Sequence, residues 1–261
     1  MNIAVLIKQV PDTEEVRMDP ERGTMIRQGV GSIINPLDLN ALEGALAFRR
    51  IRGGKVTVFS MGPLQAEEAL REALALGADE GYLLTDSAFA GGDTWATAKV
   101  LAEACRKTGP YDLILGGEKA TDGETGQVCP EVAVMLDIPF STYVSFMELR
   151  EEGVRIRRTV EEGGEWQFLP FPCLLTVLRN LNEPSLPTLA GKKRARRTSL
   201  PRYGREELEL SEKETGLSGS PTRVVHIDYP SLTRETAFFG PGDTEKGLDL
   251  LMQKLRELAL L

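Results

Sequence analysis

The feature that most constrains the fold is an alternation, over residues 1–140, between short apolar runs and amphipathic helical patterns. The apolar runs occupy residues 3–7, 55–60, 82–84 and 112–116, and helically spaced apolar residues follow each of them. Strands and helices that alternate in this way predict right-handed crossovers and a parallel sheet covered by helices on both faces. We therefore expect an α/β fold.

Local signals mark the ends of the expected helices. Asn35, followed by Pro36 and Asp38, is typical of a helix start, and we expect the Asn35 side chain to accept hydrogen bonds from the free backbone amides. Asp93 is expected to cap a third helix in the same way. A fourth helix is predicted over residues 125–136.

Three expected strand exits are rich in small or polar residues, namely Lys8–Thr13, Ser60–Pro63 and Gly116–Gln127. Ligands of open α/β sheets bind beyond the carboxyl ends of the strands. We therefore expect all three segments to line one crevice.

The pattern changes after Pro139. Residues 144–149, 154–160 and 166–169 have the character of antiparallel strands joined by turns. Residues 173–178 return to a buried strand. These signals predict a small antiparallel extension of a mostly parallel sheet.

The domain organisation follows from these elements. Residues 1–180 are expected to form one α/β domain, with the antiparallel insertion at about 140–170. Residues 181–261 are expected to hold an extended polar arm and a C-terminal helix at about 244–260, both covering the surface of another subunit.

Composition excludes several classes of function. The net charge is -8, so general attraction to a nucleic-acid backbone is disfavoured. A single histidine, His226, rules out a multi-histidine metal site within one chain, and its Val-Val-His-Ile-Asp setting favours a strand residue. The three cysteines are widely spaced, which suits free thiols in a reducing cytoplasm. No apolar run reaches the ~18 residues of a spanning helix, so we expect a cytoplasmic protein without membrane insertion.

The strongest candidate binding segment is the loop Gly116–Gln127, in which a strand runs through glycines and hydroxyl residues into a helix. Free amides and the positive end of a helix dipole hold phosphate or pyrophosphate groups. The loop has neither the ending of a Walker loop nor the spacing Gly-x-Gly-x-x-Gly. Its residues alone leave binding and an ordinary loop equally open.

A second candidate is Ala88–Thr97, whose glycines would let a ligand approach the backbone closely. Thr94 and Thr97 lie one turn apart and would donate to ring carbonyls, although a purely structural role is favoured by the residues alone. Met61 fits either a flat ring or a gap in the core. No activated nucleophile or carboxylate pair stands out, so ligand binding without side-chain chemistry is expected.

Taken together, these residues resemble the beta subunit of electron transfer flavoproteins over essentially the whole chain. The motifs that carry the resemblance are Val5–Thr13, Ile34–Pro36, Ser60–Pro63, Ala73–Asp79, Ala120–Gln127, Gly163–Glu165 and Asn182–Leu189. The resemblance implies a Rossmann-like fold of the adenine nucleotide alpha hydrolase type, and a heterodimer with an FAD-carrying alpha subunit. It also implies a nucleotide in the crevice, which is AMP in the ordinary branch and a second FAD in the electron-bifurcating branch.

The segment Phe89–Thr97 resembles the bifurcating branch, whose Phe-x-Gly-x-Asp-Thr-x-Ala-Thr pattern it matches. That branch implies hydride transfer from NADH to the FAD of the beta subunit. One electron then passes to ferredoxin or flavodoxin, and the other passes through the alpha subunit to an acyl-CoA dehydrogenase-like flavoprotein. The cofactor-binding residues expected on this basis are Leu6, Lys8, Asn35, Met61, Phe89, Gly91, Asp93, Thr94, Thr97, Lys119, Ala120, Asp122, Gly123, Thr125, Gly126, Gln127 and Val128.

The resemblance further implies a partner-recognition loop at Asn182–Leu189, with Glu183, Pro184 and the apolar anchor Leu189 as partner-binding residues. The chain departs from the family at Cys129, where glycine is usual, and this thiol is either a harmless substitution or reactive if the helix dipole lowers its pKa. The alternative functions are an ordinary carrier with AMP and a stand-alone adenine-nucleotide-binding module. The basic run 192–197 indicates a solvated face, an acidic docking partner or a nucleotide phosphate.

Overall fold

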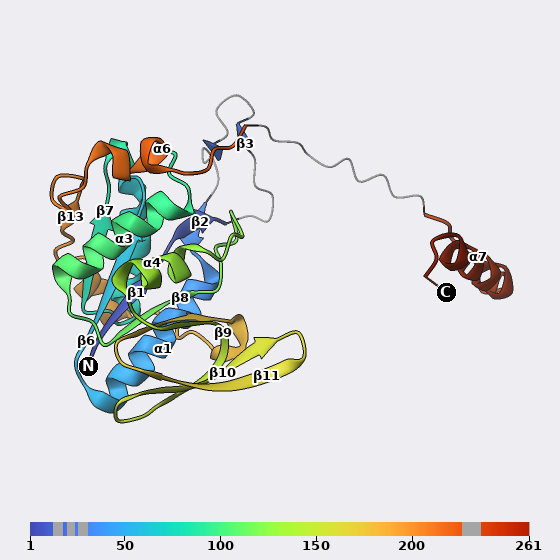
Figure 1. Ribbon diagram of the computed structural model, residues 1–261. Helices are drawn as coiled ribbons and strands as arrows, with labels where there is room; N and C mark the ends of the chain where they lie inside the picture. The colour runs from blue at the N-terminus through green and yellow to red at the C-terminus, as the bar shows by residue number, and fades with distance from the viewer. Residues whose placement is uncertain (13–17, 20–23, 26–30, 226–235, 261) are drawn as a thin grey trace. The chain divides into compact units, whose positions relative to one another are not determined.

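The computed structural model describes residues 1–12, 18–19, 24–25, 31–225 and 236–260 (Figure 1). Two of the residues discussed above, Thr13 and His226, lie outside this described part. Contacts divide the chain into two compact units, Met1–Val225 and His226–Leu261.

The strands confirm the predicted α/β architecture. Within the described residues, nine strands form one sheet in the order β11-β10-β9-β12-β8-β1-β6-β7-β13. Their bounds are β1 Asn2–Leu6, β6 Lys55–Met61, β7 Glu80–Leu84, β8 Leu113–Gly117, β9 Phe140–Leu149, β10 Gly153–Val160, β11 Gly163–Pro170, β12 Cys173–Val177 and β13 Arg202–Tyr203. In this spatial order, each neighbouring pair from β9 through β12, β8, β1, β6 and β7 to β13 is parallel. The pairs β9–β10 and β10–β11 are antiparallel. Two small antiparallel ladders join β2 (Gln9–Pro11) to β5 (Ser32–Ile34) and β3 (Met18–Asp19) to β4 (Thr24–Met25).

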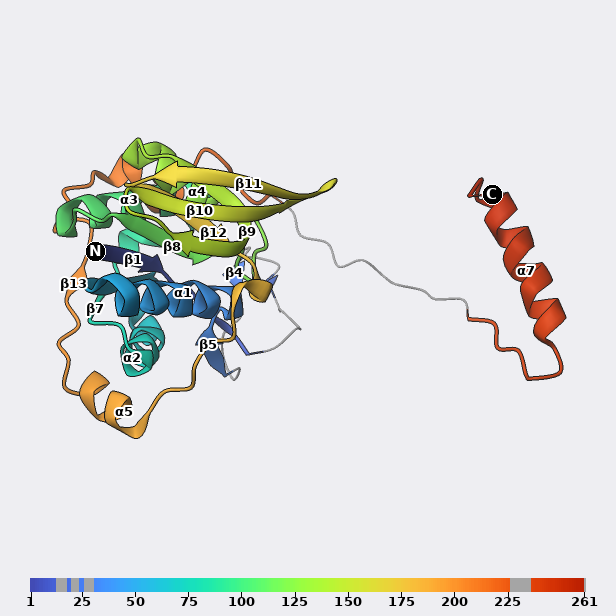
Figure 2. The same cartoon turned by 90° about the horizontal axis from the view of Figure 1, so that it is seen from below.

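Helices cover both faces of this sheet (Figure 2). Their bounds are α1 Pro36–Arg52, α2 Glu67–Leu76, α3 Thr94–Thr108, α4 Val128–Leu136, α5 Leu189–Ala195, α6 Gly216–Gly219 and α7 Thr244–Glu257, with 3₁₀ turns at 64–66, 87–89, 179–181 and 212–214. One buried cluster joins α1 and α2 to the sheet, and a second joins α3 and α4 to its other face. The central strands are buried along nearly their whole length, as expected for parallel strands covered on both sides.

Residues 181–225 run over the surface of their own unit. This stretch packs on its own unit: α5 lies against α2, β13 pairs with β7, and α6 contacts α3. Polar sequence hid these contacts because they are made by short elements without helical or alternating periodicity. The first compact unit accordingly extends to Val225.

The second unit is described by itself. Its helix α7 has exposed apolar side chains at Leu248, Leu251 and Met252. No helix in the described residues is both long enough and apolar enough to cross a membrane.

Candidate functional site

The chain order of the strands places a topological switch point between β1 and β8. From β1 the chain proceeds to β6 and β7 on one side, and β8 then returns to the other side of β1. Helix α1 follows the β1 exit and helix α3 leads into β8, and the two helices lie on opposite faces of the sheet. A crevice opens at the carboxyl ends of the strands where such crossovers diverge.

Asp38 in the first turn of α1 ties the two strands together at this point. Its Oδ2 accepts a hydrogen bond from the Lys8 amide at 2.8 Å, and its Oδ1 accepts one from the Gly117 amide at 2.9 Å. A Cβ at Gly117 would lie 2.5 Å from the same carboxylate, so glycine is required for the approach. The sequence showed Asp38 only as a helix-start residue; its bridging role depends on contacts across 79 positions.

The Asp38 carboxyl is almost wholly buried, and this sets its ionisation. Burial raises its pKa from 3.8 to about 6, although hydrogen bonds from Asn35, Lys8 and Gly117 and the charge of Lys8 oppose the rise. The group therefore titrates near neutral pH at the centre of the crevice.

Asn35 does not cap α1 with its side chain, so that prediction was wrong. Its Oδ1 accepts from the Thr121 amide at 3.2 Å, and its Nδ2 donates to the Lys119 carbonyl at 3.0 Å. The side chain is used instead to hold the loop that follows β8. Because Asn35 is buried, both of its polar groups need such partners.

The loop after β8 is held further by charged residues. Lys8 Nζ lies 2.7 Å from Asp122 Oδ1, and the Asp122 side chain is only 3% exposed. Lys119 lies 3.3 Å from Glu124 and thus has a carboxylate partner in the loop itself. The predicted meeting of the β1 exit with the Gly116–Gln127 segment is therefore seen in direct contacts. The 3₁₀ turn that follows the β6 exit joins them through Gln9, whose Nε2 donates to the Gln65 carbonyl at 3.2 Å.

Helix α4 begins at Val128, three residues later than expected. The positive φ angles of Glu124 and Gly126 keep residues 124–127 out of the helix. Gln127 provides no side-chain cap, and no side chain among the described residues accepts from the first amides of α4. This helix start is chemically suited to an anionic group.

The second candidate segment meets the first at Thr94. Asp93 caps α3 as predicted, with its Oδ1 accepting from the Ala96 amide at 3.0 Å. Thr94 Oγ1 lies 3.0 Å from Glu131 Oε1 and 3.4 Å from Gln127 Oε1. The hydroxyl thus joins the start of α3 to the start of α4.

Glu131 was not singled out from the sequence, where it reads as an ordinary first-turn acid. Burial raises its pKa above the ordinary value against the hydrogen bond from Thr94, and the charge of Asp93 adds to the rise. Its second oxygen, Oε2, is buried and has no hydrogen-bond partner among the described residues. A buried oxygen of this kind calls for a polar partner.

The remaining predicted cofactor residues fall into two environments. Apolar side chains belong to, or pack against, the buried cluster beneath α3 and α4: Leu6, Met61, Phe89 and Val128. Four loop residues and Thr97 of α3 are exposed or half-buried. The loop residues are Ala120, Gly123, Thr125 and Gly126. A Cβ added at Gly91 would meet the Leu217 Cβ at 3.6 Å, so the space beside this glycine is taken up by the chain's own arm.

Cys129 is not an activated thiol. Burial raises its pKa far above the ordinary value, and the charges of Asp38 and Cys105 act in the same direction. Its Sγ fills the space beside Gly116, where an added Cβ would lie 2.5 Å away. Of the two alternatives for Cys129, this environment favours the harmless substitution, in which the side chain fills space under the loop.

The expected partner loop is exposed. Leu189, the first residue of α5, is 86% exposed, and Glu183 and Pro184 are also exposed. Leu186, at 89%, is a further exposed apolar residue that the sequence interpretation passed over. Part of the adjoining basic run is structural, since Arg194 donates to the Leu74 and Ala78 carbonyls at the end of α2.

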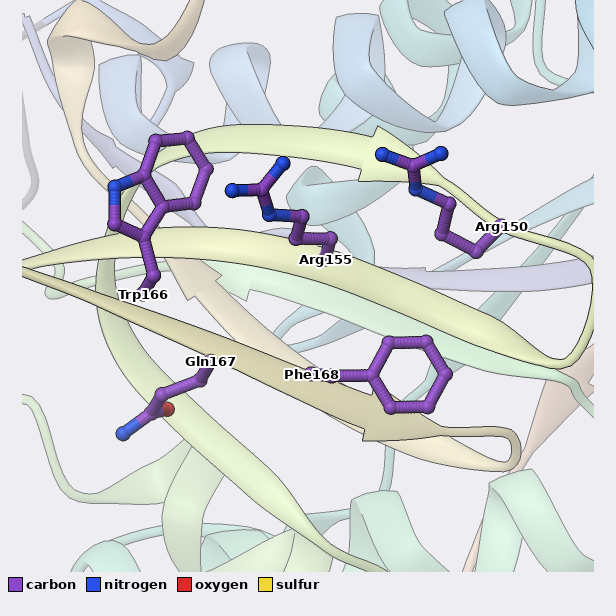
Figure 3. Close-up of a pocket in the computed structure, with 5 residues that line it drawn as sticks. All are labelled: Arg150, Arg155, Trp166, Gln167 and Phe168. Atoms are coloured by element: carbon purple, nitrogen blue, oxygen red, sulfur yellow. The ribbon is translucent and has the colours of Figure 1, made fainter.

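A separate shallow pocket lies on the antiparallel extension (Figure 3). Its lining comes from Arg150 and from residues of β10 and β11. Arg155 stacks 4.2 Å above the Trp166 ring, and Arg150 pairs with Glu148 at 2.6 Å. The two arginines thus have interaction partners within the protein, and the pocket lies on a different part of the sheet from the crevice.

Comparison with known proteins decides the family. A family model described as "Electron transfer flavoprotein domain" matches residues 22–203. The chain belongs to the electron transfer flavoprotein family. It is of the beta-subunit type, because "Electron transfer flavoprotein subunit beta" of Thermoanaerobacterium thermosaccharolyticum is 49% identical over 256 residues, 98% of each chain. Beta subunits of electron transfer flavoproteins pair with an alpha subunit.

Two further relatives carry other names. "Caffeyl-CoA reductase-Etf complex subunit CarD" of Acetobacterium woodii is 46% identical over 231 residues, 88% of each chain. "Protein FixA" of Azorhizobium caulinodans is 42% identical over 245 residues, covering 91% of this chain and 87% of the relative. The electron transfer flavoprotein beta subunit described here is thus similar along most of its length to proteins with different names.

Proposed function

We propose that this chain is the beta subunit of an electron-bifurcating flavoprotein and that its crevice binds FAD. The flavin, when bound, would provide two kinds of redox chemistry. These are the uptake of hydride from NADH, and the division of the electron pair between a low-potential acceptor and the FAD of the alpha subunit. The protein's own contribution is position, hydrogen bonding and exclusion of water.

The observation that carries the proposal is the junction at Thr94. There the segment expected at a flavin ring meets the segment expected at a pyrophosphate, and Glu131 Oε2 is left buried without a partner among the described residues. A polar ligand lying along both segments would satisfy that oxygen. FAD has a ring system and a pyrophosphate joined by a flexible chain, which suits the two segments better than a compact nucleotide does.

The residues of the crevice have distinct roles in this proposal. The uncapped start of α4 and the loop held by Asn35 and Lys8 would bind the phosphates. The apolar side chains of Met61 and Phe89 would lie under the flat ring and keep water away. The Thr94 hydroxyl donates its hydrogen to Glu131, so its oxygen would accept a hydrogen bond from a flavin. If Glu131 is protonated, the Thr94 hydroxyl is free to donate to the flavin instead.

Partner assignments follow the same proposal. Exposed Leu189 would anchor an acyl-CoA dehydrogenase-like flavoprotein, with Glu183 and Pro184 at the rim of the contact. Ferredoxin or flavodoxin would take the low-potential electron. A cytoplasmic location agrees with three unpaired cysteines, Cys105, Cys129 and Cys173.

The test is a double substitution, Thr94→Val with Thr97→Val, in the heterodimer with the alpha subunit. Loss of two hydroxyls at about 0.5–1.5 kcal/mol each should weaken binding of the beta-subunit flavin by roughly tenfold. Anaerobic titration with NADH should then reduce less flavin, while the flavin of the alpha subunit stays bound.

Thr108→Val is the matched control, because Thr108 lies at the other end of α3 and bonds to Ala104 and Tyr111. It should lower thermal stability without changing flavin content. Equal flavin loss in both variants would mean that α3 acts only through stability and would count against the proposal.

A further inference from the structure

Asp93 binds a part of the chain far from it in sequence. Its Oδ2 accepts from both the amide and the hydroxyl of Thr222, at 2.9 and 2.8 Å. Its amide donates to Ser220 Oγ at 2.8 Å. The partners are 127 and 129 positions away, so these bonds exist only because residues 215–222 fold back onto the start of α3.

Close backbone packing accompanies these hydrogen bonds. The Leu217 amide donates to the Ala90 carbonyl at 3.2 Å, and the Gly216 Cα approaches Gly92. A Cβ at Gly216 would collide with the carbonyl oxygens of Ala88 and Ala90, and its φ of +52° also favours glycine. Thr215 is 1% exposed. The glycines of the 88–93 loop thus accommodate the arm.

We propose that Ser220 and Thr222 are positioning residues of the cofactor site, which act through Asp93 to fix the helix start that carries Thr94. Asp93 is then held from three directions: by its own helix through Ala96, and by the arm through Ser220 and Thr222. Thr94 follows it directly and reaches Glu131 and Gln127. The arm therefore completes the crevice wall formed by the two candidate segments.

The ionisation of Asp93 agrees with this role. Burial acts to raise its pKa, but the hydrogen bonds from Ala96 and Thr222 outweigh burial and hold the pKa below the ordinary value. The carboxylate is thus charged at neutral pH, and charge-assisted hydrogen bonds are the stronger kind.

This inference rests on the proposed function only in taking the crevice as a nucleotide site. The test uses the heterodimer with the double substitution Ser220→Ala and Thr222→Val. Asp93 keeps its bond to Ala96 in this variant, so the helix cap remains. Ser218→Ala is the matched control, since Ser218 is exposed and makes no side-chain hydrogen bond among the described residues.

Two measurements follow on each variant. We expect the dissociation constant of the crevice nucleotide to rise about tenfold in the double variant and to stay within twofold of the wild type in the control. Hydrogen exchange of residues 88–97 should become faster in the double variant alone. If the nucleotide is FAD, its absorbance spectrum and reduction potential should shift, and those of the alpha-subunit flavin should not.

The outcomes separate the two proposals. An unchanged dissociation constant with unchanged exchange, even at a lower melting temperature, would overturn the positioning role. Equal effects in the Ser218→Ala control would overturn it as well. If the wild-type crevice holds AMP, the bifurcating function fails, while the dissociation constant of AMP still decides the role of Ser220 and Thr222.

Discussion

At the scale of single residues, Asp38 has the most demanding environment in the crevice. Its carboxyl is buried and accepts hydrogen bonds from two separate segments, Lys8 just after β1 and Gly117 at the end of β8. The group that orders the switch point therefore carries a desolvation cost when it is ionised. The charged group that faces it is Lys8, just after β1, and the neutral thiol of Cys129 from α4 lies near it.

This environment predicts a pH dependence of stability. The folded pKa of about 6 lies above the unfolded value of 3.8, so the native state binds more protons between them. The contribution of Asp38 is fully present below the unfolded pKa and is lost as the pH rises through about 6. Compared with Asp38→Asn, the wild type should gain about 1 kcal/mol of unfolding free energy between pH 8 and pH 5.

Urea unfolding of both proteins at several pH values measures this difference. The side-chain amide that Asp38→Asn introduces has a single acceptor oxygen, so one hydrogen bond from a backbone amide is lost. We therefore also expect a difference in unfolding free energy between the two proteins that is the same at every pH. A difference between the two proteins that does not vary with pH would contradict the shifted pKa.

Gly117 gives a second residue-scale prediction. In Gly117→Ala the added Cβ would lie 2.5 Å from Asp38 and 2.7 Å from Leu37, and overpacking should cost about 2 kcal/mol. Gly123→Ala, in the same loop region, places its Cβ in open space and should change stability little. Thermal unfolding compares them, and an equal effect at the two positions would argue against the tight clamp at Gly117.

Helix-capping signals show how far a single residue in the sequence predicts its own hydrogen bonds. Asp93 caps its helix as predicted, because an N-cap depends only on the next three residues. Asn35 has the same local signal but bonds to Lys119 and Thr121, because a buried amide is satisfied by whatever the tertiary fold brings to it. Asp38 and Glu131 were missed for that reason too: their importance comes from residues distant in sequence.

At the scale of elements, long periodic segments were predictable and short ones were not. The strands of the parallel core and the antiparallel extension appear where apolar runs predicted them. The later start of α4 depends on positive φ angles at Glu124 and Gly126, of which only the glycine is visible in sequence. The pairing of β13 with β7 spans two residues, too few to give a pattern.

The loop before α5 carries the element-scale prediction. Leu189→Ala should slow electron delivery to the dehydrogenase about tenfold or more, because an exposed apolar anchor in a small interface is worth ~2 kcal/mol. Reduction of flavin by NADH should be unchanged. Ile51→Ala is the matched control, being 72% exposed at the end of α1. Equal loss in both kinetic assays would mean that Leu189 has a structural role.

The base of the recognition loop is held by hydrogen bonds that do not involve Leu189, so the Leu189→Ala variant should keep the loop conformation. Asn40 donates to the Arg179 and Asn182 carbonyls, and Asn182 donates back to the Asn40 carbonyl at 3.0 Å. These bonds fix the base of the loop independently of Leu189.

At the scale of the whole molecule, the two units differ in how much apolar surface they bury. The first unit has two buried clusters, whereas α7 of the second has no buried residue and exposes Leu248, Leu251 and Met252. An amphipathic helix with an exposed apolar face fits a role in binding the alpha subunit. Sequence periodicity predicted this helix, but its partner stays a prediction.

Removal of residues 226–261 should therefore weaken association with the alpha subunit while leaving the first unit folded. Circular dichroism checks the fold of the shortened chain, and sedimentation of the mixed subunits measures the association. Undiminished association would show that α7 contributes nothing to the heterodimer.

The central claim is that the crevice between β1 and β8 holds FAD. Extraction and quantification of nucleotides from the purified wild-type heterodimer tests it most directly. The account predicts two FAD and no AMP per heterodimer, whereas one FAD with one AMP would contradict it and assign the chain to the ordinary electron carriers.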